Sequence, residues 1–163
     1  MLLHAVITKY SLNSNTISIS LSDKYKFPEI VATMKGFLMD ICKILVVEDD
    51  QNISELIGIT LSNPQYAITY VDNGKAVLET LSREKPDLII LDILIPEPGG
   101  WKIYDFVRSN PEFNNVRVLV FSAFTFTPEF LLKQNIVSAD CVMKKPFELE
   151  ELRANVKKLI NIA

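Results

Sequence analysis

Residues 43–49 read Lys-Ile-Leu-Val-Val-Glu-Asp, so an apolar run ends directly in acidic side chains. Residues 87–92, Asp-Leu-Ile-Ile-Leu-Asp, repeat this arrangement later in the chain. Both runs have the length and composition of buried strands. A buried strand has no reason to end in unpaired carboxylates unless a cation or a reactive group lies at its tip. The two runs therefore predict neighbouring strands whose tips form an acidic pocket.

From residue 43 onward, short apolar runs alternate with stretches of helical period. The expected strands are Lys43–Val47, Ala67–Val71, Asp87–Leu91, Arg117–Phe121 and Ala139–Met143. The expected helices are at about Ile53–Ser62, Gly74–Glu84, Trp101–Ser109, Pro128–Asn135 and Leu149–Ile160. This alternation predicts an α/β fold, in which helices cover both faces of a five-stranded parallel sheet. Ligands of such sheets bind beyond the carboxyl ends of the strands, which is where the acidic residues fall.

Composition excludes several classes of protein. At 163 residues the chain has room for one ordinary domain, with or without an appendage. The net charge of −3 argues against a general surface for nucleic acid or anionic membranes. Residues 30–47 are apolar on average but contain Lys35, Asp40 and Lys43, which does not suit a membrane-spanning helix. We therefore expect a soluble, cytoplasmic protein.

The two cysteines, Cys42 and Cys141, lie inside apolar runs far apart in the sequence. We interpret them as small core residues in a reducing compartment rather than as a disulfide. Their spacing does not fit a metal site.

Residues 1–38 do not follow the alternation of strands and helices. Residues 17–21 alternate apolar and serine side chains, a weak strand pattern, and Pro28–Leu38 has apolar residues at helical spacing. Two interpretations compete: an appendage that packs on the domain or on a partner, and a disordered or untranslated leader. We favour the leader, because the first strand begins shortly after Met39. The folded domain would then span residues 39–163.

The acids at the strand ends are Glu48, Asp49 and Asp50 after the first strand and Asp92 after the third. In a sheet of order 2-1-3-4-5 these strands are neighbours, so the acids converge. Two carboxylates about 4 Å apart repel by about 4 kcal/mol at an effective dielectric constant near 20. Either a cation neutralises them or some of their pKa values rise. Oxygen ligands select a hard cation, and Mg²⁺ fits best. The alternative is that these acids, Asp50 especially, are solvated caps of the following helices.

Two further polar residues follow the later strands. Ser122 ends the fourth strand, where its hydroxyl could donate to an anionic oxygen. Lys145 follows the fifth strand and could either supply a point charge to a phosphoryl group or pair with Asp92. Taken singly, Ser122 suits a loop and Lys145 suits the surface. Taken together, the acids, the hydroxyl and the lysine are suited to moving a phosphoryl group onto an aspartate.

Four segments of the sequence form a joint pattern: Ile44-Leu45-Val46-Val47-Glu48-Asp49-Asp50, Pro86-Asp87-Leu88-Ile89-Ile90-Leu91-Asp92, Pro96 with Gly100, and Lys145-Pro146-Phe147. Together they resemble the receiver domain of bacterial two-component response regulators. The resemblance covers about residues 41–163. It implies a doubly wound sheet of flavodoxin-like order 2-1-3-4-5.

The resemblance also implies roles for the site residues. Asp92 would be phosphorylated from a phosphohistidine on a sensor histidine kinase or a histidine phosphotransfer protein. Glu48, Asp49 and Asp92 would hold Mg²⁺, joined by the backbone carbonyl of Leu94. Ser122 and Lys145 would contact the phosphoryl group, and the bond between Lys145 and Pro146 would be cis.

The only histidine, His4, lies outside the matching region, so we expect the donor histidine on another protein. We expect no output domain, because the chain stops within the last helix. A receiver of this kind, similar to the stand-alone chemotaxis type, would signal by binding a downstream partner that the sequence does not identify, or would relay the phosphoryl group. We expect neither nucleic acid nor membrane as that partner.

The chain also departs from the family pattern. Val142 stands at the switch position, where an aromatic residue is usual, so gating by an aromatic rotamer is not expected. Gly99 replaces an acid commonly found before the glycine of the loop after Asp92. Leu94 and Phe124 follow Asp92 and Ser122 by two residues and are apolar. We predict that these two side chains shield the aspartyl phosphate from water.

Other functions fit the sequence less well. The alternative is a degenerate receiver that binds partners without phosphorylation, but all the acceptor and metal residues are present. A phosphatase with an aspartyl nucleophile would need an acid where Leu94 stands, so we do not expect an enzyme. No glycine-rich loop follows the first strand, which argues against a flavin or dinucleotide site.

Overall fold

The computed structural model describes residues 7–13, 16–21, 41–134, 136 and 141–160. Contacts divide the chain into two compact units, Met1–Asp40 and Ile41–Ala163.

The first unit contains a hairpin of two antiparallel strands, β1 (Ile7–Asn13) and β2 (Thr16–Leu21). Leu12 pairs with Ile17 near the turn, and the register shifts between Ile7 and Lys9. The predicted strand pattern at residues 17–21 therefore falls within β2. The helical pattern predicted at Pro28–Leu38 lies outside the described residues, and whether residues 1–38 form a leader stays a prediction.

The second unit is built on a parallel sheet of five strands in the order β4-β3-β5-β6-β7. The strands are β3 (Cys42–Val47), β4 (Tyr66–Val71), β5 (Leu88–Asp92), β6 (Arg117–Ser122) and β7 (Cys141–Lys144). Counted within this unit, the order is 2-1-3-4-5, which confirms the predicted doubly wound, flavodoxin-like arrangement. Residues 139 and 140, which the predicted fifth strand included, lie outside the described residues.

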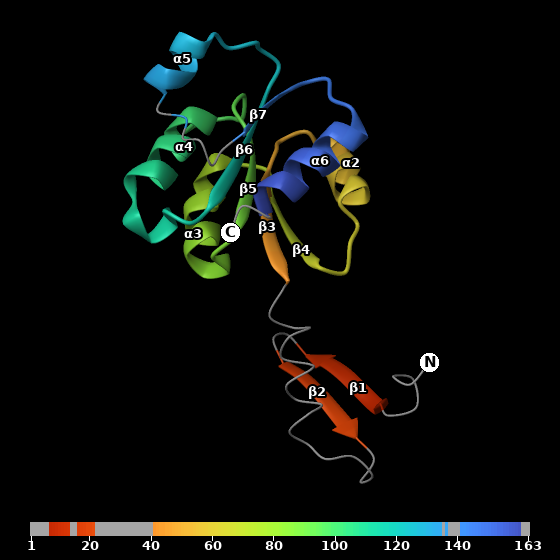
Figure 1. Ribbon diagram of the computed structural model, residues 1–163. Helices are drawn as coiled ribbons and strands as arrows, with labels where there is room; N and C mark the ends of the chain where they lie inside the picture. Colours follow the sequence, from red (N-terminus) through yellow and green to blue (C-terminus); the bar gives the residue numbers. More distant parts are fainter. Residues whose placement is uncertain (1–6, 14–15, 22–40, 135, 137–140, 161–163) are drawn as a thin grey trace. The chain divides into compact units, whose positions relative to one another are not determined.

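Helices cover both faces of this sheet. They are α2 (Gln51–Thr60), α3 (Gly74–Glu84), α4 (Gly100–Ser109), α5 (Pro128–Lys133) and α6 (Leu149–Ile160), with a short 3₁₀ turn, η2, at Pro111–Phe113. Helices α2 and α6 lie on one face, and α3 and α4 lie on the other (Figure 1). Because the central strands β3, β5 and β6 are covered on both sides, they are almost continuously apolar.

The core forms two clusters, one on each face, because successive residues of a strand point to opposite faces. In β3, Leu45 and Val47 pack with Val77 of α3, while Ile44 and Val46 join the cluster beneath α2 and α6. All four of these strand side chains are buried. The sheet is therefore a rigid base for the residues that follow its strand ends.

The first helix begins before its predicted start. Asp50 is its N-cap, and its carboxylate accepts hydrogen bonds from the backbone N–H groups of Asn52 (2.8 Å) and Ile53 (3.3 Å). These bonds lower the pKa of Asp50. The capping role considered for Asp50 is thus confirmed.

Both cysteines are free, and Cys42 is buried. Within the described part of the chain, no helix is both long and apolar enough to cross a membrane.

Candidate functional site

Strand register brings the predicted site residues to one level of the sheet. Val47 of β3 pairs with Leu91 of β5, so the next residues along each strand, Glu48 and Asp92, stand side by side. On the other side of β5, β6 ends at Ser122. The carboxyl ends of these three adjacent strands therefore meet, as the pattern predicted.

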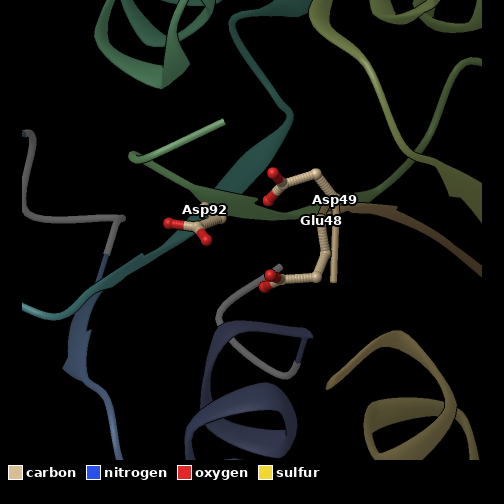
Figure 2. Close-up of side chains that lie close together, drawn as sticks. All are labelled: Glu48, Asp49 and Asp92. Atoms are coloured by element: carbon tan, nitrogen blue, oxygen red, sulfur yellow. The ribbon is translucent and has the colours of Figure 1, made fainter. Parts of the chain in front are cut away.

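Three carboxylates converge at this edge. Glu48, Asp49 and Asp92 each place one carboxylate oxygen within 4.8 Å of the others. Figure 2 shows Glu48 and Asp49 leaving the end of β3 and all three side chains pointing toward a common space. Glu48 and Asp92 are buried at 3 % and 5 % exposure, whereas Asp49 is exposed. A set of hard oxygen donors, one side of it open to solvent, fits Mg²⁺ with water completing its shell.

Lys145 joins two of these acids. Its ammonium Nζ lies 2.6 Å from Glu48 Oε2 and 2.6 Å from Asp92 Oδ2. The structure thus confirms the predicted pairing with Asp92 and adds Glu48, which the sequence did not indicate. Burial alone would lower the pKa of Lys145, but the hydrogen bonds to Asp92 and Glu48 and their charges raise it. The lysine is therefore held in its charged form.

The pKa of Glu48 lies above its ordinary value even though the acid is bound by Lys145. Its pKa is raised from an ordinary value of 4.5 to about 7, chiefly because the carboxyl is buried. The hydrogen bond and charge of Lys145 lower the pKa and offset part of this rise, and the charge of nearby Asp92 adds to the rise. A buried acid of this kind, next to a second acid, gains from additional positive charge. The electrostatics therefore agree with a cation site.

Backbone contacts hold Lys145 in place. Its N–H donates to the carbonyl of Ser122 at 2.7 Å, and its bond to Pro146 is cis, as predicted. Its Nζ lies 5.9 Å from the centre of the Phe121 ring, which packs against Phe147. Sequence reasoning did not identify Phe121 as a support for the lysine, because nothing in its strand pattern separates it from other core residues.

Ser122 is fully buried at the end of β6. Its Oγ accepts a hydrogen bond of 2.9 Å from the backbone N–H of Phe124. The N–H of Leu94 donates to Asp92 Oδ1 at the same distance, 2.9 Å. The two loops thus form matching turns in which a side chain holds the residue two positions later.

The apolar residues of these turns lie open to solvent. Leu94 is 52 % exposed and Phe124 is 60 % exposed. The shielding of an aspartyl phosphate by these two side chains stays a prediction. The role of the Leu94 carbonyl as a metal ligand stays a prediction. Val142 is half-buried against the core cluster of α3 and α4, so a small aliphatic residue occupies the predicted switch position.

The loop between Asp92 and α4 depends on close contacts at glycine. A Cβ at Gly100 would lie 2.4 Å from the carbonyl oxygen of Asp92 and 2.5 Å from Cα of Ile93. Gly99 has a φ of +82°, which few side chains tolerate. In the sequence, Gly100 is recognisable only as part of a motif with Pro96. Its contact with the backbone of Asp92 gives it a physical role.

A groove of about 820 Å³ extends from the acidic residues along α2. Its other lining residues include Glu55, Gly58 and Ile59 of α2 and Tyr70 of β4. Ile59 is 75 % exposed and Tyr70 is 48 % exposed. The site therefore opens onto a surface that is partly apolar and partly acidic.

Comparison with known protein families agrees with the geometry of the site. The model of the response regulator receiver domain matches residues 44–157. The chain belongs to this family of two-component signalling domains.

Individual relatives share about a third of their residues with this chain over the aligned region. The chain is 34 % identical over 118 residues to the probable transcriptional regulatory protein SilR of Salmonella typhimurium, covering 72 % of this chain and 50 % of that protein. It is 30 % identical over 118 residues to the response regulator MprA of Mycobacterium leprae, with coverage of 72 % and 50 %. The chain thus spans about half the length of these relatives.

Solved structures agree on the fold. A signal receiver domain of a histidine kinase from Syntrophus aciditrophicus aligns with a TM-score of 0.65 at 27 % identity, covering 75 % of this chain and 92 % of that one. The chemotaxis protein CheY4 of Vibrio cholerae aligns with a TM-score of 0.65 at 24 % identity, covering 73 % and 98 %. The latter similarity supports the fold alone.

Proposed function

We propose that the chain accepts a phosphoryl group on Asp92 from a phosphohistidine of a sensor histidine kinase or a histidine phosphotransfer protein. The observation that carries this proposal is the ammonium of Lys145 bound to Asp92 and Glu48, beside a third carboxylate at the same sheet edge. In the transfer, a carboxylate oxygen of Asp92 attacks phosphorus, the phosphorus–nitrogen bond breaks, and the imidazole leaves. The product is an acyl phosphate.

The remaining residues would neutralise the charge of the transferred group. Glu48, Asp49 and Asp92, with the Leu94 carbonyl, would hold Mg²⁺, which supplies positive charge to the phosphoryl oxygens when it is bound. Lys145 would move its hydrogen bond from the carboxylate of Asp92 to a phosphoryl oxygen, and the Ser122 hydroxyl would donate to another. Lys145 is already held beside Asp92 and Glu48, so little ordering of its side chain would be needed on phosphorylation.

The groove along α2 would receive the donor protein. It begins at Glu48 and Asp49 and continues past exposed Ile59 and Tyr70, so it offers apolar contacts next to the acceptor. After phosphorylation the domain would signal by binding an unidentified protein partner in the cytoplasm, with neither a nucleic acid nor a membrane as its direct target. We propose no enzymatic turnover, because an apolar Leu94 stands where an aspartyl phosphatase carries its second acid.

The alternative is a degenerate receiver that acts without phosphorylation. The complete set of acids and the partly buried Lys145 argue against it, since a pure interaction module would have no need for them.

One experiment separates the two functions. The full chain is incubated with acetyl phosphate and Mg²⁺, and its intact mass is measured. We expect the mass of one phosphoryl group to be added to the parent and to Asp105→Asn, whose aspartate is exposed on α4, but not to Asp92→Asn. An unmodified parent protein would instead support the degenerate receiver.

A further inference from the structure

An aromatic stack holds the loop after Ser122 against α4. It consists of Trp101 of α4, Phe126 of the loop and Phe130 of α5, and we name these three residues the aromatic latch. Phe126 and Phe130 are stacked, with ring centres 4.9 Å apart and planes at 12°. Both rings meet Trp101 edge-on, at 5.4 Å and 5.6 Å. Trp101 in turn contacts the buried Tyr104 at 5.9 Å.

The latch is the main apolar attachment of a weakly anchored segment. None of the residues of α5 is fully buried, and Leu132 is 78 % exposed. Residues 123–125 of the loop are exposed as well. A segment with so little buried apolar surface opens at low free energy unless specific contacts hold it. The three rings supply such contacts, each pair contributing about 0.5–1.5 kcal/mol beyond simple burial.

The loop connects the latch to the site. At its near end, the Oγ of Ser122 accepts a hydrogen bond from the N–H of Phe124. At its far end, two residues beyond Phe124, the ring of Phe126 lies in the latch. A movement of Ser122 toward a group bound at Asp92 would therefore displace the loop through its hydrogen bond to Phe124. Two residues further along the loop, Phe126 is held by its contact with Trp101.

The predicted switch position of the domain carries no aromatic side chain. Val142 of β7 is aliphatic and half-buried, so it offers no ring that could change place when Ser122 moves. The latch offers one ring on the same loop as Ser122, that of Phe126, in contact with the rings of Trp101 and Phe130. Trp101 is also the single tryptophan of the chain, so its fluorescence reports on this cluster alone.

From these contacts we propose that the aromatic latch stabilises the resting position of the loop and so sets the affinity of the site for a phosphoryl group. The inference rests on the proposed function, because it assumes that such a group binds at Asp92. A ligand shifts the loop only by its difference in affinity for the two loop positions, so contacts that favour the resting position weaken binding. Loosening the latch should tighten binding.

The test uses beryllofluoride with Mg²⁺ as the phosphoryl probe on the full chain. Binding is followed by ¹⁹F NMR, and Trp101 emission is recorded in the same titration. We expect the parent protein to bind and its Trp101 emission to change. Phe126→Leu should bind the probe about three- to tenfold more tightly, which is the loss of one or two ring contacts expressed as affinity. Phe130→Leu should act in the same direction.

The matched control is Phe106→Leu. Phe106 lies on the same helix as Trp101 and pairs with Phe113 at 6.0 Å, outside the latch, and it is 39 % exposed. Its affinity should stay within about 1.5-fold of the parent, since it makes none of the latch contacts. Probe affinity in Phe126→Leu that is equal to or weaker than that of the parent would overturn the latch while leaving the proposed function intact. A parent protein that does not bind the probe would overturn both.

Discussion

Lys145 Nζ lies 2.6 Å from Asp92 Oδ2 although the two residues follow strands that are not neighbours in the sheet. Strand β6 lies between β5 and β7, so the lysine side chain reaches across the end of β6 beside Phe121. The side chain of Lys145 is 15 % exposed and that of Asp92 is 6 % exposed. A pair fixed in this way, with little solvent around it, places one positive charge where a phosphoryl group on Asp92 would need it.

Removal of this charge is expected to weaken phosphoryl binding. In Lys145→Gln the site loses its ammonium and Glu48 loses its buried partner, so affinity for beryllofluoride with Mg²⁺ should fall by at least about tenfold. The measurement is a ¹⁹F NMR titration of the full chain. Lys144→Gln is the control, because Lys144 is exposed at the end of β7, directly before Lys145. Equal losses in the two variants would contradict a specific role for Lys145.

Glu48→Gln is expected to weaken Mg²⁺ binding by about tenfold or more, because an amide oxygen replaces a charged ligand of a hard cation. Isothermal titration calorimetry without any phosphodonor measures this directly. Glu55→Gln removes a charge of the same kind from the exposed, groove-facing side of α2 and should change the affinity little. If both variants bind Mg²⁺ as the parent does, the ion lies elsewhere.

Leu94→Asn is expected to shorten the lifetime of the aspartyl phosphate. Leu94 is half exposed beside Asp92, and a polar side chain there would admit or orient water that the leucine excludes. The half-life is followed after the phosphodonor is removed. Ile59→Asn likewise replaces an exposed apolar side chain, on α2 and away from the acceptor turn, and should leave the half-life unchanged. An unchanged or longer half-life in Leu94→Asn would count against shielding.

Cys42 is expected to resist alkylation in the folded protein. Burial, together with the charge of Asp87, raises the pKa of its thiol from 9.0 to about 12. At pH 9 the unfolded thiol is half ionised, and the folded thiol is ionised roughly 500-fold less, since each pKa unit is a factor of ten. Iodoacetamide labelling of Cys141→Ser, with and without denaturant, measures the difference. Fast labelling of the native protein would show that Cys42 is not in the core.

The same shift predicts how stability depends on pH. Above pH 9 the unfolded thiol loses its proton while the folded thiol keeps it, so the unfolded state binds fewer protons. The contribution of Cys42 to the free energy of unfolding is therefore complete below pH 9 and falls as the pH rises toward about 12. Chemical denaturation at several alkaline pH values should show a shallower decline in Cys42→Ala than in the parent.

The sheet and the acidic edge could be predicted because they rest on local signals. A strand buried on both faces must be apolar throughout, so the change from Val47 to Glu48 and from Leu91 to Asp92 marks both the strand end and the site. Parallel topology then brings these ends together. The predicted helix boundaries were less exact. The first helix was expected to begin at about Ile53, whereas α2, capped by Asp50, begins at Gln51.

Contacts between distant segments could not be predicted in this way. The close approach of Gly100 to the backbone of Asp92 depends on the exact path of the loop. The second bond of Lys145, to Glu48, depends on how far the side chain extends across β6. Trp101 and Phe126 carry no shared periodicity, so their contact appears only in the folded chain.

The most direct test of the central claim is to find which residue carries the phosphoryl group. The full chain is treated with acetyl phosphate and Mg²⁺ and then with hydroxylamine, which converts an acyl phosphate into a stable hydroxamate on the same residue, and the product is digested and sequenced by mass spectrometry. The account predicts a hydroxamate at Asp92 that disappears when Mg²⁺ is withheld. A hydroxamate on another residue, or none in the presence of Mg²⁺, would contradict it.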